Sequence, residues 1–185
     1  MNLNKWFEKG MTHIEYIQSM DMNQENLLRI YNEFAPSREA IHFLQSLQNK
    51  NWRAVILTAD WCGDAMLNIP IFMRLANEGL IDTRFLIRDD NLELMDQFLT
   101  NGGRSIPLMI ILDRDGNFIT RWGPRSPLGQ DIVMSMKKNM PNPEDEQFET
   151  ARKEFIKKAT HELLTNEKLW DSVEKSLVAA FQEHA

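Results

Sequence analysis

The chain has 185 residues, of which 43% are hydrophobic and 26% charged, the mixture of an ordinary globular protein rather than a disordered one. This length predicts a single domain with a sizeable apolar core, and it argues against two independent domains. The formal net charge of −6 argues against a nucleic-acid partner, because attraction to phosphate backbones requires clustered lysine and arginine.

The sequence also indicates whether the protein crosses a membrane and in which compartment it resides. No stretch approaches the roughly 20 apolar residues that cross a bilayer, and the first residues lack the basic-then-apolar order of a signal peptide. The single cysteine, Cys62, excludes an internal disulfide, which suits a reducing compartment. We therefore expect a cytoplasmic protein without a membrane partner.

The first part of the chain predicts three helices. Thr12 and Glu15 have the spacing of a capping box, and residues 24–34 and 37–49 carry apolar side chains at helical intervals. No chemical motif is found here, so we expect these helices to serve in packing.

From residue 52 the pattern changes to strand, helix, strand. Residues 52–58 are continuously apolar and rich in β-branched side chains, which predicts a central strand buried on both faces. Residues 64–77 predict a helix that is interrupted by Pro70 and closed by Gly79. The next strand is expected at residues 83–87, parallel to the first because one crossover joins them.

A short helix and a β-hairpin follow. Residues 91–99 predict the helix, and residues 108–112 and 118–122 predict two strands around a turn at residues 113–117. The Asp-x-Asp-Gly stretch of this turn resembles part of a calcium loop, but further oxygen ligands are absent. No metal site is expected there.

Beyond Leu128 the chain is predicted to be helical, with a break at residues 140–143. The last helical region carries an apolar stripe: Phe148, Phe155, Ala159, Leu163, Trp170, Val173 and Leu177. We expect the stripe to dock on the core rather than on a partner. His161 begins a partial zinc-protease motif that lacks its second histidine, so the sequence predicts neither a metal nor a cofactor.

The one cysteine lies within Trp61-Cys62-Gly63-Asp64-Ala65, between the central strand and the helix that contains Pro70. Unpaired backbone N–H groups and the helix dipole favour a thiolate at this place, and in such settings thiol pKa values fall from roughly 8.5 to about 3.5–7.5. Asp64 opposes this effect modestly, and Arg104 is expected to favour it. The sequence predicts an exposed thiol with a lowered pKa.

The landmarks of residues 52–138 together resemble the thioredoxin family. They are the Trp-Cys-Gly motif, Pro70 eight positions after Cys62, the Ile106-Pro107 pair before a strand, and Gly123 at the end of the hairpin. The resemblance implies an α/β thioredoxin-like fold with a central four-stranded mixed sheet flanked by helices. The sequence adds helical extensions at residues 1–51 and 139–185, all within one domain.

Carried over by position, the resemblance makes Cys62 the attacking sulfur and Pro107 the cis-proline beside it. The backbone of Ile106 would pair with an extended substrate segment, and Gly123 would let another chain's backbone approach closely. The remaining substrate contacts are assigned to the residues around the sulfur: Trp61, Gly63 and Asp64.

The sequence departs from the family at Ala65, which occupies the position of the resolving cysteine. Turnover between a dithiol and an internal disulfide is therefore excluded, and monothiol exchange remains. The expected partners are disulfide-containing or mixed-disulfide proteins and a low-molecular-weight thiol. Two alternatives stay open: a non-catalytic binding or scaffold protein of this fold, and a thiol redox sensor.

Overall fold

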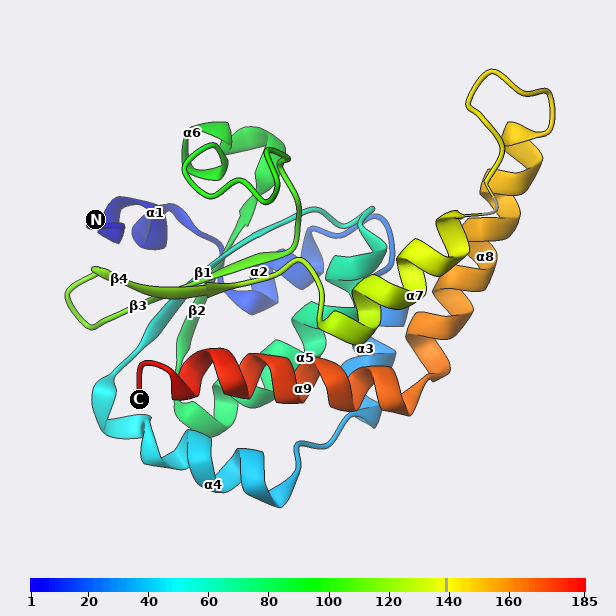
Figure 1. Ribbon diagram of the computed structural model, residues 1–185. Helices are drawn as coiled ribbons and strands as arrows, with labels where there is room; N and C mark the ends of the chain where they lie inside the picture. The colour runs from blue at the N-terminus through cyan, green and yellow to red at the C-terminus, as the bar shows by residue number, and fades with distance from the viewer. Residues whose placement is uncertain (139) are drawn as a thin grey trace.

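The computed structural model describes residues 1–138 and 140–185 and has a four-stranded mixed sheet at its centre (Figure 1). The strands are β1 (Arg53–Thr58), β2 (Asp82–Ile87), β3 (Leu108–Leu112) and β4 (Phe118–Trp122). Their spatial order is β2-β1-β3-β4, with β1 parallel to β2 and antiparallel to β3, and with β3 antiparallel to β4. The α/β class, the four-stranded mixed sheet and its flanking helices agree with the prediction.

The two central strands are apolar on both faces because both faces are covered. All five residues of β3 and all but the first residue of β1 are buried. Ile56 of β1 lies between Phe85 of β2 and Met109 of β3, at the middle of this layer.

Helices surround the sheet. They are α1 (Asn4–Lys9), α2 (His13–Gln18), α3 (Gln24–Glu33), α4 (Arg38–Ser46), α5 (Gly63–Gly79), α6 (Leu92–Met95), α7 (Pro127–Lys137), α8 (Phe148–Thr165) and α9 (Glu167–Gln182). In Figure 1, α1 and α6 lie on one side of the sheet, and α4, α5 and α9 lie on the other. Helices α3, α4 and α9 all contact α5, so α5 is the centre of the larger helical layer. No helix in the described part of the chain combines the length and apolarity that a membrane span requires.

The N-terminal residues are tied to both edges of the sheet. Met11 and Phe85 exchange two backbone hydrogen bonds at the β2 edge, of 2.9 and 2.8 Å. At the opposite edge, the N–H of Phe118 donates to the carbonyl of Met1 at 3.0 Å. The predicted capping box is present, because Thr12 and Glu15 hydrogen-bond each other reciprocally at the start of α2.

Two helical predictions need correction. Pro70 does not interrupt α5, which continues through it and ends at Gly79; the left-handed residue that closes it is Leu80, with φ 50°. Burial of α5 on nearly all sides outweighs the hydrogen bond that proline removes. The helix expected at residues 91–99 is limited to Leu92–Met95.

The predicted apolar stripe divides into two parts. Leu163 and the stripe residues of α9 are buried, as expected for docking on the core. Phe148, Phe155 and Ala159, in the earlier part of α8, are only partly buried. That part of the expectation is wrong, because α8 extends beyond the edge of the body before it reaches α5 (Figure 1).

Candidate functional site

Cys62 lies where β1 passes into α5, as the motif predicted. Its N–H donates to the carbonyl of Ala59 at 3.1 Å, and its own carbonyl accepts the N–H of Met66 at 3.0 Å. Cys62 is therefore the N-cap residue of α5, with extended backbone angles. This position directs the sulfur toward the loop before β3.

The sulfur is buried rather than exposed. Only 8% of Cys62 is accessible, and its Sγ donates a hydrogen bond of 3.4 Å to the carbonyl of Ile106. Burial raises the pKa of Cys62 above its ordinary value, and the Asp64 carboxylate adds to this rise. The backbone N–H of Ala65 acts in the opposite direction but does not overcome desolvation. The expected exposed thiol with a lowered pKa is therefore wrong.

The loop that receives the sulfur hydrogen bond contains a cis peptide bond between Ile106 and Pro107. Both residues are buried, and Leu108, the first residue of β3, follows directly. The carbonyl of Ile106 is engaged by the thiol, whereas its N–H has no hydrogen-bond partner within the described residues. One backbone donor next to the sulfur is thus left unpaired within the part of the chain that the structure describes.

Gly123 meets the same loop from the end of β4. Its φ is 130°, and a Cβ at this position would lie 2.2 Å from the carbonyl oxygen of Pro107. Only glycine fits here, because any side chain would overlap that carbonyl. Within the chain itself, the backbone that approaches Gly123 is that of Pro107 and Leu108.

Asp64 is held by an arginine that the sequence analysis did not single out. Arg125 forms a bidentate pair with Asp64, with Nε–Oδ1 and Nη2–Oδ2 distances of 2.8 and 2.7 Å. The positive charge of Arg125 lowers the pKa of Cys62, although this is a smaller influence than burial. Arg104, which we expected in this role, instead pairs with Asp96 at an exposed position. Arg125 lies far from Cys62 in sequence, and only the fold brings the two together.

Trp61 and Gly63 lie on either side of the sulfur in the sequence and differ in their surroundings. Trp61 is 48% exposed, and the guanidinium of Arg88 lies 4.9 Å from its ring centroid. Gly63 is covered by α8, since a Cβ on it would lie 3.5 Å from Cδ1 of Leu163. Ala65, at the position of the missing cysteine, is 1% exposed. Trp61 at the start of the motif is therefore exposed, whereas Gly63 is covered on one side by a side chain of α8.

The N-terminal helices also support the site, which the sequence did not reveal. The hydroxyl of Tyr16 in α2 lies 3.0 Å from Oγ1 of Thr58, at the end of β1. Burial raises the pKa of Tyr16 to about 12. Asp60, in the loop before Cys62, accepts the backbone N–H groups of Asp21 and Met22. The capping box predicted α2 but contained no signal of where the helix packs.

A cysteine at the tip of the helix after a central strand, facing a cis-proline loop, is the arrangement of thioredoxin-like proteins. The family model described as thioredoxin matches residues 10–138, more than half of the sequence. The chain therefore belongs to the thioredoxin-like family. The match begins within the N-terminal section, well before the region on which the resemblance rested.

Two solved structures share the fold over the whole chain. One is PA1234, a protein of unknown function from Pseudomonas aeruginosa, with a TM-score of 0.71 and 15% identity, covering 100% of this chain and 99% of that one. The other is an HIV epitope scaffold, with a TM-score of 0.67 and 15% identity, covering 100% of both chains. No curated protein matches the sequence. At this identity the two structures support the fold alone.

Proposed function

We propose that this protein exchanges thiols and disulfides through Cys62 alone. The Cys62 thiolate attacks a substrate disulfide, forms a mixed disulfide and releases the other sulfur as a thiolate, which takes up a proton. An external low-molecular-weight thiolate then attacks the mixed disulfide and releases Cys62. The observation that carries the proposal is the placement of the only cysteine, 3.4 Å from the Ile106 carbonyl beside cis-Pro107. Membership of the thioredoxin-like family supports a redox role.

The residues around the sulfur have separate tasks in this proposal. The free N–H of Ile106 donates to an extended substrate segment, and the exposed face of Trp61 gives the segment a surface to contact. Asp64 and Gly123, which are partly exposed, border the same surface, and Gly63 borders it at the side that Leu163 leaves uncovered. Ala65 leaves no second sulfur, so release depends on the external thiol, which a reducing compartment such as the cytoplasm supplies.

The raised pKa of Cys62 sets the expected pH dependence. Because most of the thiol is protonated at neutral pH, exchange should be slow there and should accelerate as the pH rises toward the thiol pKa.

The test is reduction of a peptide carrying a mixed disulfide with a small thiol, with excess small thiol as reductant. Wild type should turn over faster than the uncatalysed reaction, and its rate should increase between pH 7 and pH 9. The Cys62→Ser variant should react no faster than the uncatalysed reaction. Equal rates for wild type and this variant would refute the proposal.

A second candidate function is non-catalytic binding of an extended peptide by the cis-proline loop. It is favoured by the buried, protonated thiol, whose hydrogen bond occupies the Ile106 carbonyl. In this case the Cys62→Ser variant should still capture its partner and function in the cell. The wild-type protein should not increase the rate of thiol–disulfide exchange above the uncatalysed rate. The same variant therefore separates the two candidates.

A further inference from the structure

Residues 140–162, here called the arm, project from the body of the molecule (Figure 1). None of these residues is buried, whereas Leu163 directly after them is. An α-helix of 18 residues such as α8 is about 27 Å long, so its N-terminal part extends far beyond its contact with α5.

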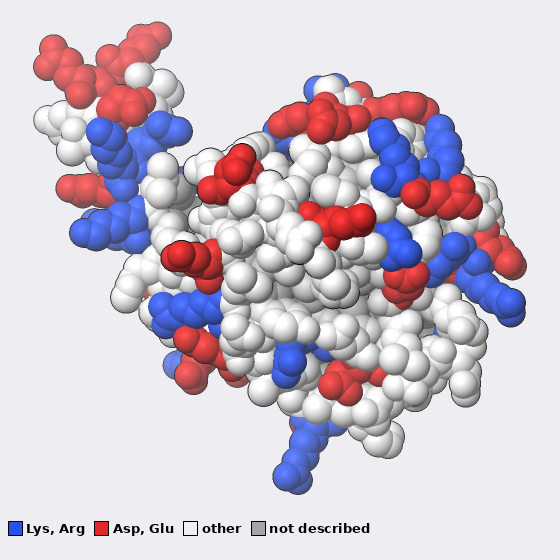
Figure 2. Space-filling model, turned by 180° about the vertical axis from the view of Figure 1, so that it is seen from behind, with Lys and Arg blue, Asp and Glu red and all other residues white. Residues whose placement is uncertain are grey.

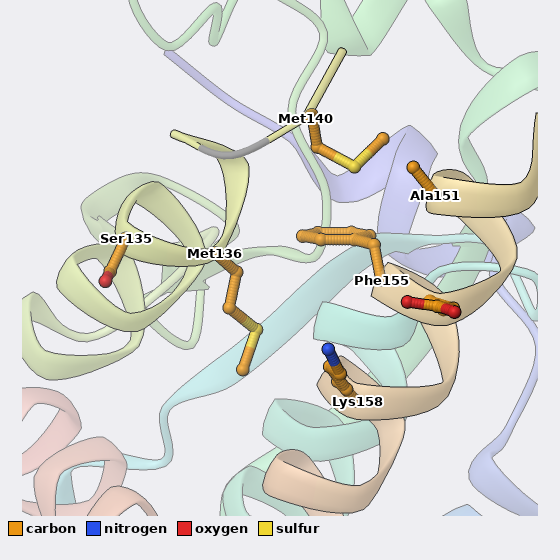
Figure 3. A pocket seen from close by; sticks show the side chains of 7 residues that line it. Ser135, Met136, Met140, Ala151, Phe155 and Lys158 are labelled. Carbon is orange, nitrogen blue, oxygen red and sulfur yellow. The ribbon is translucent and has the colours of Figure 1, made fainter. Parts of the chain in front are cut away.

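The arm is nevertheless partly apolar. Phe148, Phe155 and Ala159 recur at helical spacing, and Ile156 next to them is 49% exposed. A groove of about 340 Å³ separates this part of α8 from the end of α7. Figure 3 shows Met136, Met140 and Phe155 gathered at this groove. An apolar helix face left open in this way is a candidate interface.

The charges of the arm are separated along its length. Its outer end carries the acidic residues Glu144, Asp145, Glu146 and Glu149. The following turns carry the basic residues Arg152, Lys153, Lys157 and Lys158 and one acidic residue, Glu154, and Arg152 lies 3.5 Å from Glu149 within the arm. In Figure 2 the arm projects at the upper left, with acidic side chains at its tip and basic ones beneath them. All of these charged side chains are exposed. Two arms that run antiparallel would place the acidic end of each opposite the basic turns of the other.

We propose that the arm binds the arm of a second copy of this chain, antiparallel and around a two-fold axis. The same surface then serves on both subunits, Phe148 and Phe155 of each arm lie along the contact, and the acidic end of each arm lies opposite the basic turns of the other. A single pair of helices buries less area than a standard interface, so the dimer should be weak, with a dissociation constant on the order of 10–100 µM. The inference is independent of the proposed chemistry at Cys62.

Two variants of matched size test the pairing by sedimentation velocity. The acidic-arm variant carries Lys153→Glu, Lys157→Glu and Lys158→Glu, and the basic-arm variant carries Glu144→Lys, Glu146→Lys and Glu149→Lys. Asp145 is left unchanged because its carboxylate accepts the N–H of Gln147 at the start of α8. All six substituted side chains are exposed, so equal thermal melting of the variants and wild type serves as the control for folding.

Wild type should dimerise at about 100 µM, and each variant alone should associate at least about ten-fold more weakly, because like charges then face each other. An equimolar mixture of the two variants should dimerise at least as well as wild type. A monomeric wild type at this concentration, variants that dimerise unchanged, or a mixture that stays monomeric would each overturn the proposal.

Discussion

The ionisation of Cys62 is governed by a few neighbours. Burial and Asp64 raise its pKa, while backbone N–H groups of α5 and Arg125 lower it. The strand-to-helix pattern located the sulfur at a helix start, and the resemblance to the thioredoxin family placed the Ile106-Pro107 loop beside it. Neither showed that the thiol is buried or that Arg125 rather than Arg104 is the nearby cation, because both of these features depend on segments distant in sequence.

Removing either partner of the Asp64–Arg125 pair should therefore shift the pKa of Cys62, downward for Asp64 and upward for Arg125. Asp64→Asn should lower the pKa of Cys62, since it removes a negative charge. Arg125→Gln should raise it and cost about 1–2 kcal/mol of stability, because Asp64 loses a charged hydrogen-bond partner at a partly buried position. The pH dependence of Cys62 alkylation measures both shifts.

Asp96→Asn is the matched control for that experiment, since it breaks the exposed Asp96–Arg104 pair and should leave the Cys62 pKa unchanged. If this variant moved the pKa as far as Asp64→Asn, or if the other two shifts had the opposite sign, the assignment of Arg125 would be wrong.

At the scale of elements, local pattern predicted the strands well and the helices less well. The bounds of β3 and β4 agree with the prediction because the turn between them contains Gly116 and an Asp113 carboxylate that accepts backbone N–H groups of the hairpin. The continuity of α5 through Pro70 and the open outer part of α8 were not predictable. Both depend on what surrounds a helix, which periodicity does not contain.

The C-terminal end of helix α9 should contribute strongly to the stability of the fold, because it carries a large buried side chain. Phe181 is fully buried and makes edge-on contacts with Trp52 and Phe72, with centroids 6.0 and 6.4 Å apart. Phe181→Ala should lower the free energy of unfolding by about 3–5 kcal/mol, measured by urea denaturation. Ile14→Ala, at a side chain 57% exposed, should cost less than about 1 kcal/mol. Similar losses for the two variants would show that α9 is not docked as described.

At the scale of the whole molecule, two buried groups couple folding to alkaline pH. Folding raises the pKa of Cys62 above its ordinary value and that of Tyr16 to about 12. A raised pKa means that the unfolded chain loses the proton first as pH increases. The stabilisation is thus complete below the ordinary pKa of each group and is lost as pH rises through the raised one.

The free energy of unfolding should therefore fall as pH rises above 9, with the contribution of Tyr16 concentrated between pH 10 and 12 and amounting to about 2–3 kcal/mol at most. Denaturation with urea at several pH values measures this slope. Tyr16→Phe should flatten the slope above pH 10, since the phenol is the titrating group. An unchanged slope in this variant would contradict the role of Tyr16.

By itself, the sequence determined the α/β class, the order of the strands and helices in the central region, and the position of a lone thiol at a helix start, because each follows from local periodicity, turn residues or motif spacing. The tertiary structure alone decided that this thiol is buried, that Arg125 holds Asp64, that Leu163 covers Gly63 and that the arm is left open. Desolvation and pairing depend on which distant segments meet, and that is settled by the packing of the whole chain.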